Sequence, residues 1–190
     1  MDEKFRWTIP NILSIYRICI SPVILITLLF THEKIFTILL IISLVTDILD
    51  GFIARQFNMQ TKIGAKLDSV ADAITVLLAI YGMFQFKRNE ISPFLLPFYI
   101  LIGFYLLVYL VSALKFKKFS SLHLYSAKIT GYAQGIFFFV LFCFGFYSGL
   151  FWVMFAISII TYIEEIIAIL LLKEMQSDAK GVYWIIKKKG

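Results

Sequence analysis

At residues 35–54 the chain reads IFTILLIISLVTDILDGFIA, an almost uninterrupted apolar run with two aspartates near its end. About 20 mainly apolar residues are enough for a helix to cross a lipid bilayer. The run lacks the strict apolar–polar alternation that is typical of strands in membrane barrels. We therefore expect a membrane-spanning helix here, with its two carboxylates at one membrane boundary.

The composition of the whole chain agrees with this interpretation. Of its 190 residues, 61% are hydrophobic and 16% are charged, whereas soluble domains contain about 45–50% apolar and about 25% charged residues. This excludes a soluble domain and a disordered chain. The predicted fold is an all-α polytopic membrane protein, a bundle of six transmembrane helices at residues 11–31, 35–54, 65–86, 92–114, 127–147 and 150–172.

Lysine and arginine residues are distributed unequally between the two sides of this bundle. The side of the membrane that contains the N-terminus holds Lys4, Arg6, Arg55, Lys62, Lys66, Lys115, Lys117, Lys118, Lys128 and the tail lysines. The other side holds only Lys34, Lys87 and Arg88. Basic residues mark the cytoplasmic side of membrane proteins. We expect both termini in the cytoplasm, and we interpret the net charge of +6 as a mark of that side, with no nucleic-acid partner.

The two ends of the chain differ from the apolar spans. Residues 1–172 contain no long linker and predict one membrane domain, opened by a short interfacial helix that carries Phe5 and Trp7. Residues 173–190 form a basic cytoplasmic tail, in which apolar residues precede Lys187, Lys188 and Lys189. Such a tail can lie on an anionic membrane surface or remain unstructured.

Four of the twelve acidic residues fall close together, at Asp47, Asp50, Asp68 and Asp72. Spacings of three and four residues place each pair on one face of its helix. The pairs end one span and begin the next, so the four carboxylates are predicted to converge at the cytoplasmic boundary. Because uncompensated carboxylates repel one another, and because Mg²⁺ and Mn²⁺ prefer oxygen ligands, the pattern indicates a divalent metal site.

The residues between the two pairs are suited to a phosphate group. Gly51 and Ala54 leave room beside Asp50, and Arg55 offers a planar cation. Gly64 lies near the start of the next helix, where the helix dipole favours an anion. Together these features indicate phosphoryl transfer. One alternative is a structural ion-pair cluster. Another is a transporter or proton pathway, although its acidic residues would be distributed across the thickness of the membrane and not gathered at one boundary.

The stretch from Asp47 to Arg55, followed after eight residues by Gly64 to Asp72, resembles the signature of the CDP-alcohol phosphotransferases. That signature reads D-x2-D-G-x2-A-R, about eight residues, then G-x3-D-x3-D, and all its fixed positions are present. Residues 10–17, PNILSIYR, resemble the opening of the first helix in bacterial members. The expected length and the six spans agree with the same family.

The resemblance implies transfer of a substituted phosphate from CDP-diacylglycerol to an alcohol hydroxyl, with release of CMP. It implies that two divalent cations, Mg²⁺ or Mn²⁺, are held by Asp47, Asp50, Asp68 and Asp72, and that Asp72 is also the general base. The residues assigned to donor binding are Gly51, Ala54, Arg55, Gly64 and Asn11. The resemblance further implies a homodimer in a bacterial cytoplasmic membrane, with active sites open to the cytoplasmic leaflet.

The acceptor alcohol is predicted from charge. A basic cluster between the fourth and fifth spans favours an anionic acceptor such as glycerol 3-phosphate or an inositol phosphate. The alternative is that these lysines only reflect the excess of basic residues that cytoplasmic loops usually carry. The cluster consists of Lys115, Lys117, Lys118 and Lys128. Of these, Lys128 and Lys117 are the candidate acceptor-binding residues.

Two further features leave alternatives open. Arg17, inside the first span, is a third candidate for acceptor binding, but it could also reach the donor phosphates or pair with Glu164 or Glu165. Ser69 and Ala73 stand where phosphatidylglycerophosphate synthases usually carry Pro and Lys. Serine, inositol or phosphatidylglycerol therefore remain alternative acceptors for the same chemistry.

Overall fold

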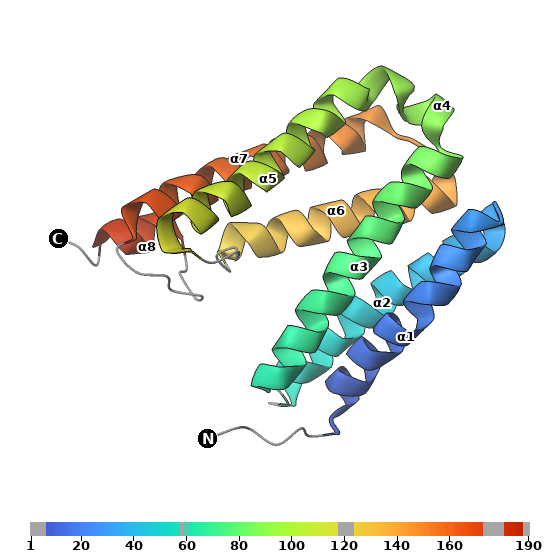
Figure 1. Ribbon diagram of the computed structural model, residues 1–190, viewed down its shortest axis with the longest axis horizontal. Coiled ribbons are helices and arrows are strands. Elements are labelled where there is room, and N and C mark those ends of the chain that lie inside the picture. The colour runs from blue at the N-terminus through green and yellow to red at the C-terminus, as the bar shows by residue number, and fades with distance from the viewer. Residues whose placement is uncertain (1–6, 58, 60, 118–123, 173–180, 188–190) are drawn as a thin grey trace. The chain divides into compact units, whose positions relative to one another are not determined.

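The computed structural model describes residues 7–57, 59, 61–117, 124–172 and 181–187, and in these ranges it contains helices and no strand. The helices are α1 (Ile9–Leu29), α2 (Glu33–Gln56), α3 (Lys62–Phe86), α4 (Arg88–Ile91), the 3₁₀ helix η1 (Ser92–Phe94), α5 (Leu95–Phe116), α6 (Tyr125–Phe144), α7 (Ser148–Leu171) and α8 (Val182–Lys187) (Figure 1). Six helical segments are long and apolar enough to cross a membrane, the fourth running from Arg88 to Phe116. The prediction of an all-α polytopic membrane protein is confirmed.

Local capping explains why several helices differ from the predicted spans by a few residues. The Thr8 hydroxyl accepts a hydrogen bond from the backbone N–H of Asn11 (3.4 Å), so α1 begins at Ile9. The Thr61 hydroxyl accepts one from the N–H of Gly64 (2.9 Å), so α3 begins at Lys62. Such caps satisfy N–H groups that the first helical turn leaves free. Gly145, with φ 97°, ends α6 before the predicted limit.

The helices group into two compact units, residues 1–90 and 91–190. In the first unit, α1 packs against both α2 and α3, and Figure 1 shows these three helices side by side. Phe36 of α2 lies against α3 at Gly82, where an added Cβ would lie 2.2 Å from the ring atom Cζ. The glycine therefore permits this close approach.

An ion pair joins α2 to the end of α3 at the extremity of the first unit opposite the aspartates. Lys87 Nζ lies 2.9 Å from a Glu33 carboxylate oxygen and 3.6 Å from one of Glu90. Partial burial lowers the pKa of Lys87, but the hydrogen bond to Glu33 and the two negative charges outweigh it and raise that pKa. The ammonium therefore remains charged.

In the second unit, α7 packs against α5, α6 and α8. Its core contains an aromatic cluster with ring centroids 4.7–6.2 Å apart, formed by Phe94, Phe98, Phe137, Phe146 and Phe151. Polar side chains join α6 to α7: Gln134 donates hydrogen bonds to Ser158 (3.3 Å) and Tyr162 (3.1 Å). Hydrogen bonds of this kind hold helices together where water is absent.

The features predicted at the two ends of the chain fall only partly on described residues. The expected interfacial helix falls mainly on residues 1–6, which lie outside the described residues, as do residues 173–180 of the tail. The tail forms the short helix α8, whose first backbone N–H, at Val182, donates a hydrogen bond to Glu164 of α7 (3.2 Å). Trp184 of α8 stacks edge-on against Tyr125 at the start of α6, with ring centroids 5.9 Å apart.

Candidate active site

The four aspartates meet because α2 and α3 run antiparallel within the first unit. Asp47 and Asp50 lie in the second half of α2, and Asp68 and Asp72 lie in the first turns of α3. Since α1 packs against both helices, side chains on its buried face lie near the same four carboxylates. The convergence predicted from the spacing is present in the structure.

Arg17 of α1 lies at the centre of this cluster and bonds to all four carboxylates. Its Nη1 donates to Asp47 Oδ1 (2.8 Å) and Asp72 Oδ1 (2.6 Å). Its Nη2 donates to Asp50 Oδ2 (2.8 Å) and Asp68 Oδ1 (2.5 Å). The two distances of 2.8 Å are typical of charge-assisted hydrogen bonds. The arginine thus links the three helices of the unit through their charged groups.

The cluster is closed on one side and open on the other. The side chain of Arg17 is 1% exposed and that of Asp50 is 3% exposed. The side chains of Asp47, Asp68 and Asp72 are 40–45% exposed. Asp50 and Arg17 therefore form the floor of the site, and the other three carboxylates can be reached from outside.

The partners of Arg17 are a finding that the sequence analysis missed. The partners expected from the sequence were an acceptor, the donor phosphates, Glu164 or Glu165, whereas the structure brings the guanidinium to the aspartates. A signal was present in the sequence, because Asn11, Ser14 and Arg17 recur every three residues and are all buried on one face of α1. Charged residues in spans face the interior of a bundle, so this face had to meet the acidic helices.

The chemistry of the donor set fits a divalent cation. One carboxylate oxygen each from Asp47, Asp50 and Asp68 lies within 4.8 Å of the others. Oxygens on opposite sides of one Mg²⁺ ion are separated by about 4.2 Å, so small side-chain movements would bring the three together. All the donors are hard oxygens, which is what Mg²⁺ and Mn²⁺ prefer. The cluster therefore offers suitable ligands for a divalent cation.

Gly64 lies where α1 meets the start of α3. A Cβ added there would lie 2.1 Å from Asn11 Oδ1 and 2.7 Å from Thr61 Oγ1. Asn11 is 2% exposed and donates a hydrogen bond to the Thr61 hydroxyl (3.4 Å). The glycine therefore makes room for the Asn11 amide, one helical turn before Asp68. The expected contact of Asn11 and Gly64 with a donor stays a prediction.

The other predicted donor residues lie at the end of α2. An added Cβ at Gly51 would lie 3.6 Å from the Nη1 atom of Arg55, an ordinary contact distance. The Arg55 guanidinium is exposed beside this glycine, and Ala54 is half-buried. The Arg55 guanidinium therefore lies over the space that Gly51 leaves on α2 next to Asp50. The expected contact of these residues with a donor stays a prediction.

The predicted acceptor lysines lie in the second unit. Lys117 ends α5 in the left-handed conformation (φ 53°), and Lys128 is exposed near the start of α6 with its ammonium 5.6 Å from the centroid of the Tyr125 ring. Their role toward an acceptor stays a prediction. Lys118, which belongs to the same predicted cluster, lies outside the described residues.

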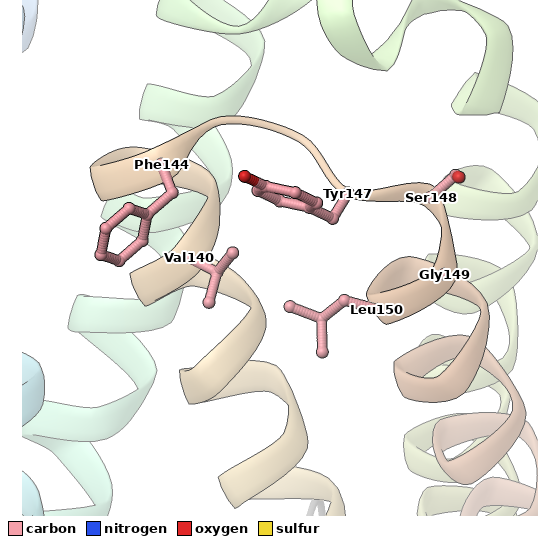
Figure 2. A pocket seen from close by; sticks show the side chains of 6 residues that line it. All are labelled: Val140, Phe144, Tyr147, Ser148, Gly149 and Leu150. Atoms are coloured by element: carbon pink, nitrogen blue, oxygen red, sulfur yellow. The ribbon is translucent and has the colours of Figure 1, made fainter.

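A hollow of about 520 Å³ lies where α6 passes into α7. Figure 2 shows its lining, which is Val140, Phe144, Tyr147, Ser148, Gly149 and Leu150. None of these side chains is charged, and all belong to the second unit. The hollow therefore shares no lining residue with the aspartate cluster, which belongs to the first unit.

Comparison with known proteins agrees with the geometry of the cluster. The chain is 33% identical over 95 residues, 50% of this chain, to the CDP-diacylglycerol–glycerol-3-phosphate 3-phosphatidyltransferase of Aquifex aeolicus, of which the match covers 52%. It is 36% identical over 79 residues to the protein of that name from Cereibacter sphaeroides, covering 40% of this chain and 36% of the relative. The chain spans about half the length, or less, of these curated relatives.

No solved structure matches the chain. The family model described as CDP-alcohol phosphatidyltransferase matches residues 7–164, a range that includes the whole of α1, α2 and α3 with Arg17 and all four aspartates. Since this match covers most of the chain, the protein belongs to the CDP-alcohol phosphatidyltransferase family.

Proposed function

We propose that this chain transfers a phosphatidyl group from CDP-diacylglycerol to the hydroxyl of glycerol 3-phosphate and releases CMP. The observation that carries the proposal is the convergence of four carboxylates from α2 and α3 on one partly open site. The family and the names of the relatives support the reaction class and this acceptor. Serine, inositol and phosphatidylglycerol are the competing acceptors.

Asp47, Asp50 and Asp68, with help from Asp72, are proposed to hold two divalent cations, Mg²⁺ or Mn²⁺. When bound, such ions neutralise the charge of a pyrophosphate and stabilise the oxygens of an in-line displacement. The role of the protein is to present the ligands. Asp50 is fixed on the floor of the site, and the exposed carboxylates of Asp47 and Asp68 face the side from which a donor can enter.

Asp72 is proposed as the general base. Its carboxylate is the most exposed of the four, at 45%, and lies one helical turn beyond Asp68. In the reaction the acceptor oxygen forms a bond to the phosphorus that carries the diacylglycerol, the bond from that phosphorus to CMP breaks, and the hydroxyl proton passes to Asp72. A carboxylate within hydrogen-bond reach of the hydroxyl can take this proton, and the attack is opposite the departing CMP.

The remaining residues are proposed to bind the substrates. Gly51, Ala54 and Arg55 would receive the nucleotide part of the donor on α2, with Gly64 and Asn11 shaping the start of α3. Lys117 and Lys128 would attract the phosphate of the acceptor. We place the site and both termini at the cytoplasmic face of a bacterial membrane, since Lys and Arg concentrate on that side, and we propose a homodimer on the resemblance to the family.

The proposal is tested with the purified protein, CDP-diacylglycerol and a panel of acceptors. Glycerol 3-phosphate, serine, inositol, inositol phosphate and phosphatidylglycerol are supplied separately with Mg²⁺ or Mn²⁺, and lipid products are identified by mass spectrometry. We expect CMP release and phosphatidylglycerophosphate with glycerol 3-phosphate, and none with chelator or with Asp50→Asn. A product with another acceptor alone would overturn the acceptor, and absence of CMP release with all of them would overturn the reaction.

A further inference from the structure

We infer that Arg17 is a resident counter-ion of the aspartate cluster, which holds the four carboxylates together in the metal-free protein and competes with divalent cations for them. The inference rests on the proposed metal-dependent function and adds a residue that sets the affinity of the site for metal. It predicts that the guanidinium loses at least some of its hydrogen bonds to the aspartates when metal binds.

The first argument is the number of donors. The two terminal nitrogens of a guanidinium carry four N–H groups. In the structure they reach four different carboxylates, Nη1 serving Asp47 and Asp72 and Nη2 serving Asp50 and Asp68. An arginine whose role was only to join its own helix to one other helix would need a single carboxylate, bound in a bidentate pair. Here a single side chain uses all four terminal donors to hold the whole predicted metal-binding set.

The second argument is charge. Among the side chains that the structure describes, Arg17 is the one cation that forms an ion pair with these aspartates. One positive charge against four negative charges leaves a net charge of −3 when all four are ionised. A divalent cation among the same carboxylates would satisfy them better and would repel the buried guanidinium, because like charges at short distance interact strongly where water is excluded.

The third argument is the Nε atom of Arg17. This nitrogen is buried and has no hydrogen-bond partner among the residues that the structure describes, and a buried donor without a partner is unfavourable. The position of Arg17 is therefore dictated by the carboxylates and does not satisfy all of its own donors. When metal takes over the carboxylates, the reason for this position disappears and the side chain is free to move.

The experiment measures Mn²⁺ binding by calorimetry in detergent, with Arg17→Gln and the wild type. Without a counter-ion to displace, Arg17→Gln should bind Mn²⁺ roughly tenfold or more tightly. Lys66→Gln is the matched control, because it removes one positive charge from an exposed residue of α3 two positions before Asp68 without touching the cluster. Its Mn²⁺ affinity should stay within about threefold of the wild type.

Thermal stability supplies a readout that is independent of affinity. With chelator, Arg17→Gln should melt at a lower temperature than the wild type, because four carboxylates then lie together uncompensated. With saturating Mg²⁺ the difference should disappear or reverse. A folded Arg17→Gln protein whose affinity for Mn²⁺ equals that of the wild type, or is weaker, would overturn the inference.

A second measurement on the wild type protects the test against a variant that fails to fold. In ¹⁵N NMR spectra the terminal guanidinium protons of Arg17, assigned with Arg17→Lys, should exchange slowly without metal and faster with saturating Mg²⁺. Unchanged protection would refute the release of the side chain while leaving the proposed function intact. If the wild type binds no divalent cation at all, both the inference and the metal-dependent function fail.

Discussion

Replacement of Gly64 by alanine tests the contact that fixes the start of α3 against α1. The new methyl group would lie 2.1 Å from Asn11 Oδ1 and 2.7 Å from Thr61 Oγ1, so the Asn11 amide has to retreat by more than an ångström. Asn11 is buried, and the Thr61 hydroxyl already accepts the hydrogen bond that caps α3. Neither group can move without a loss of packing or of a hydrogen bond.

The magnitude follows from three contributions. Overpacking a tight contact costs about 1–3 kcal/mol, and a weakened helix cap costs about 1 kcal/mol. The higher helix propensity of alanine returns at most about 1 kcal/mol. The net loss of about 1–3 kcal/mol corresponds, for a chain of this size, to a fall in Tm of roughly 2–12 °C. We expect this fall in the metal-free protein, so that metal ligation does not mask it.

The assay is thermal unfolding in detergent, followed by circular dichroism. Gly103→Ala is the control, because no described atom outside the neighbouring backbone of its own helix lies within 4 Å of a Cβ added there, and its Tm should stay equal or rise. Asn11→Ala combined with Gly64→Ala should be less destabilised than the sum of the single variants, by roughly 0.5–3 kcal/mol for groups in contact. A Gly64→Ala protein as stable as the wild type, or strict additivity, would refute the packing argument.

Three further predictions concern the chemistry, the opposite end of the first unit and the orientation in the membrane. Asp72→Asn should lower turnover about 10²–10⁴-fold while binding of a fluorescent CDP-lipid persists; complete loss of donor binding would make Asp72 a structural ligand instead. Gly82→Ala should lower Tm because its Cβ would meet the Phe36 ring at 2.2 Å, and Phe36→Leu should restore it; an unchanged Tm in Gly82→Ala would contradict that contact. In a background without the native cysteines, an impermeant thiol reagent should label Glu33→Cys from outside, whereas labelling of Lys117→Cys from that side would reverse the orientation.

The helices and the aspartate cluster could be predicted because they depend on local information. A run of apolar residues determines a span by its length alone. The spacing of Asp47 from Asp50, and of Asp68 from Asp72, determines the face of each helix by the geometry of one turn. The order of the chain then makes α2 and α3 antiparallel neighbours. No contact between distant residues had to be known for this part of the site.

The role of Arg17 is harder to predict from the sequence, because the polar face of α1 indicates where the helix packs but not which charged group the guanidinium meets. Composition cannot distinguish an arginine that binds a phosphate from one that neutralises acids, since the guanidinium serves both. Gly131 and Gly135 give a second example. They are spaced four residues apart in α6, as in a close helix contact, yet no described atom outside their own helix backbone lies within 4 Å of a Cβ added at either position. Small residues permit close packing, but they do not specify a partner.

The unequal exposure of the four aspartates gives the candidate site a direction. Asp50 and Arg17 are buried where the three helices of the first unit meet, so the charge of Asp50 is held by a hydrogen bond to the arginine and cannot be solvated by water. Asp47, Asp68 and Asp72 keep about two fifths of their side chains exposed. A ligand can reach these three carboxylates, whereas Asp50 is covered. Asp72, the proposed general base, is thus one of three carboxylates that an acceptor can reach, while Asp50 remains bonded to the buried arginine.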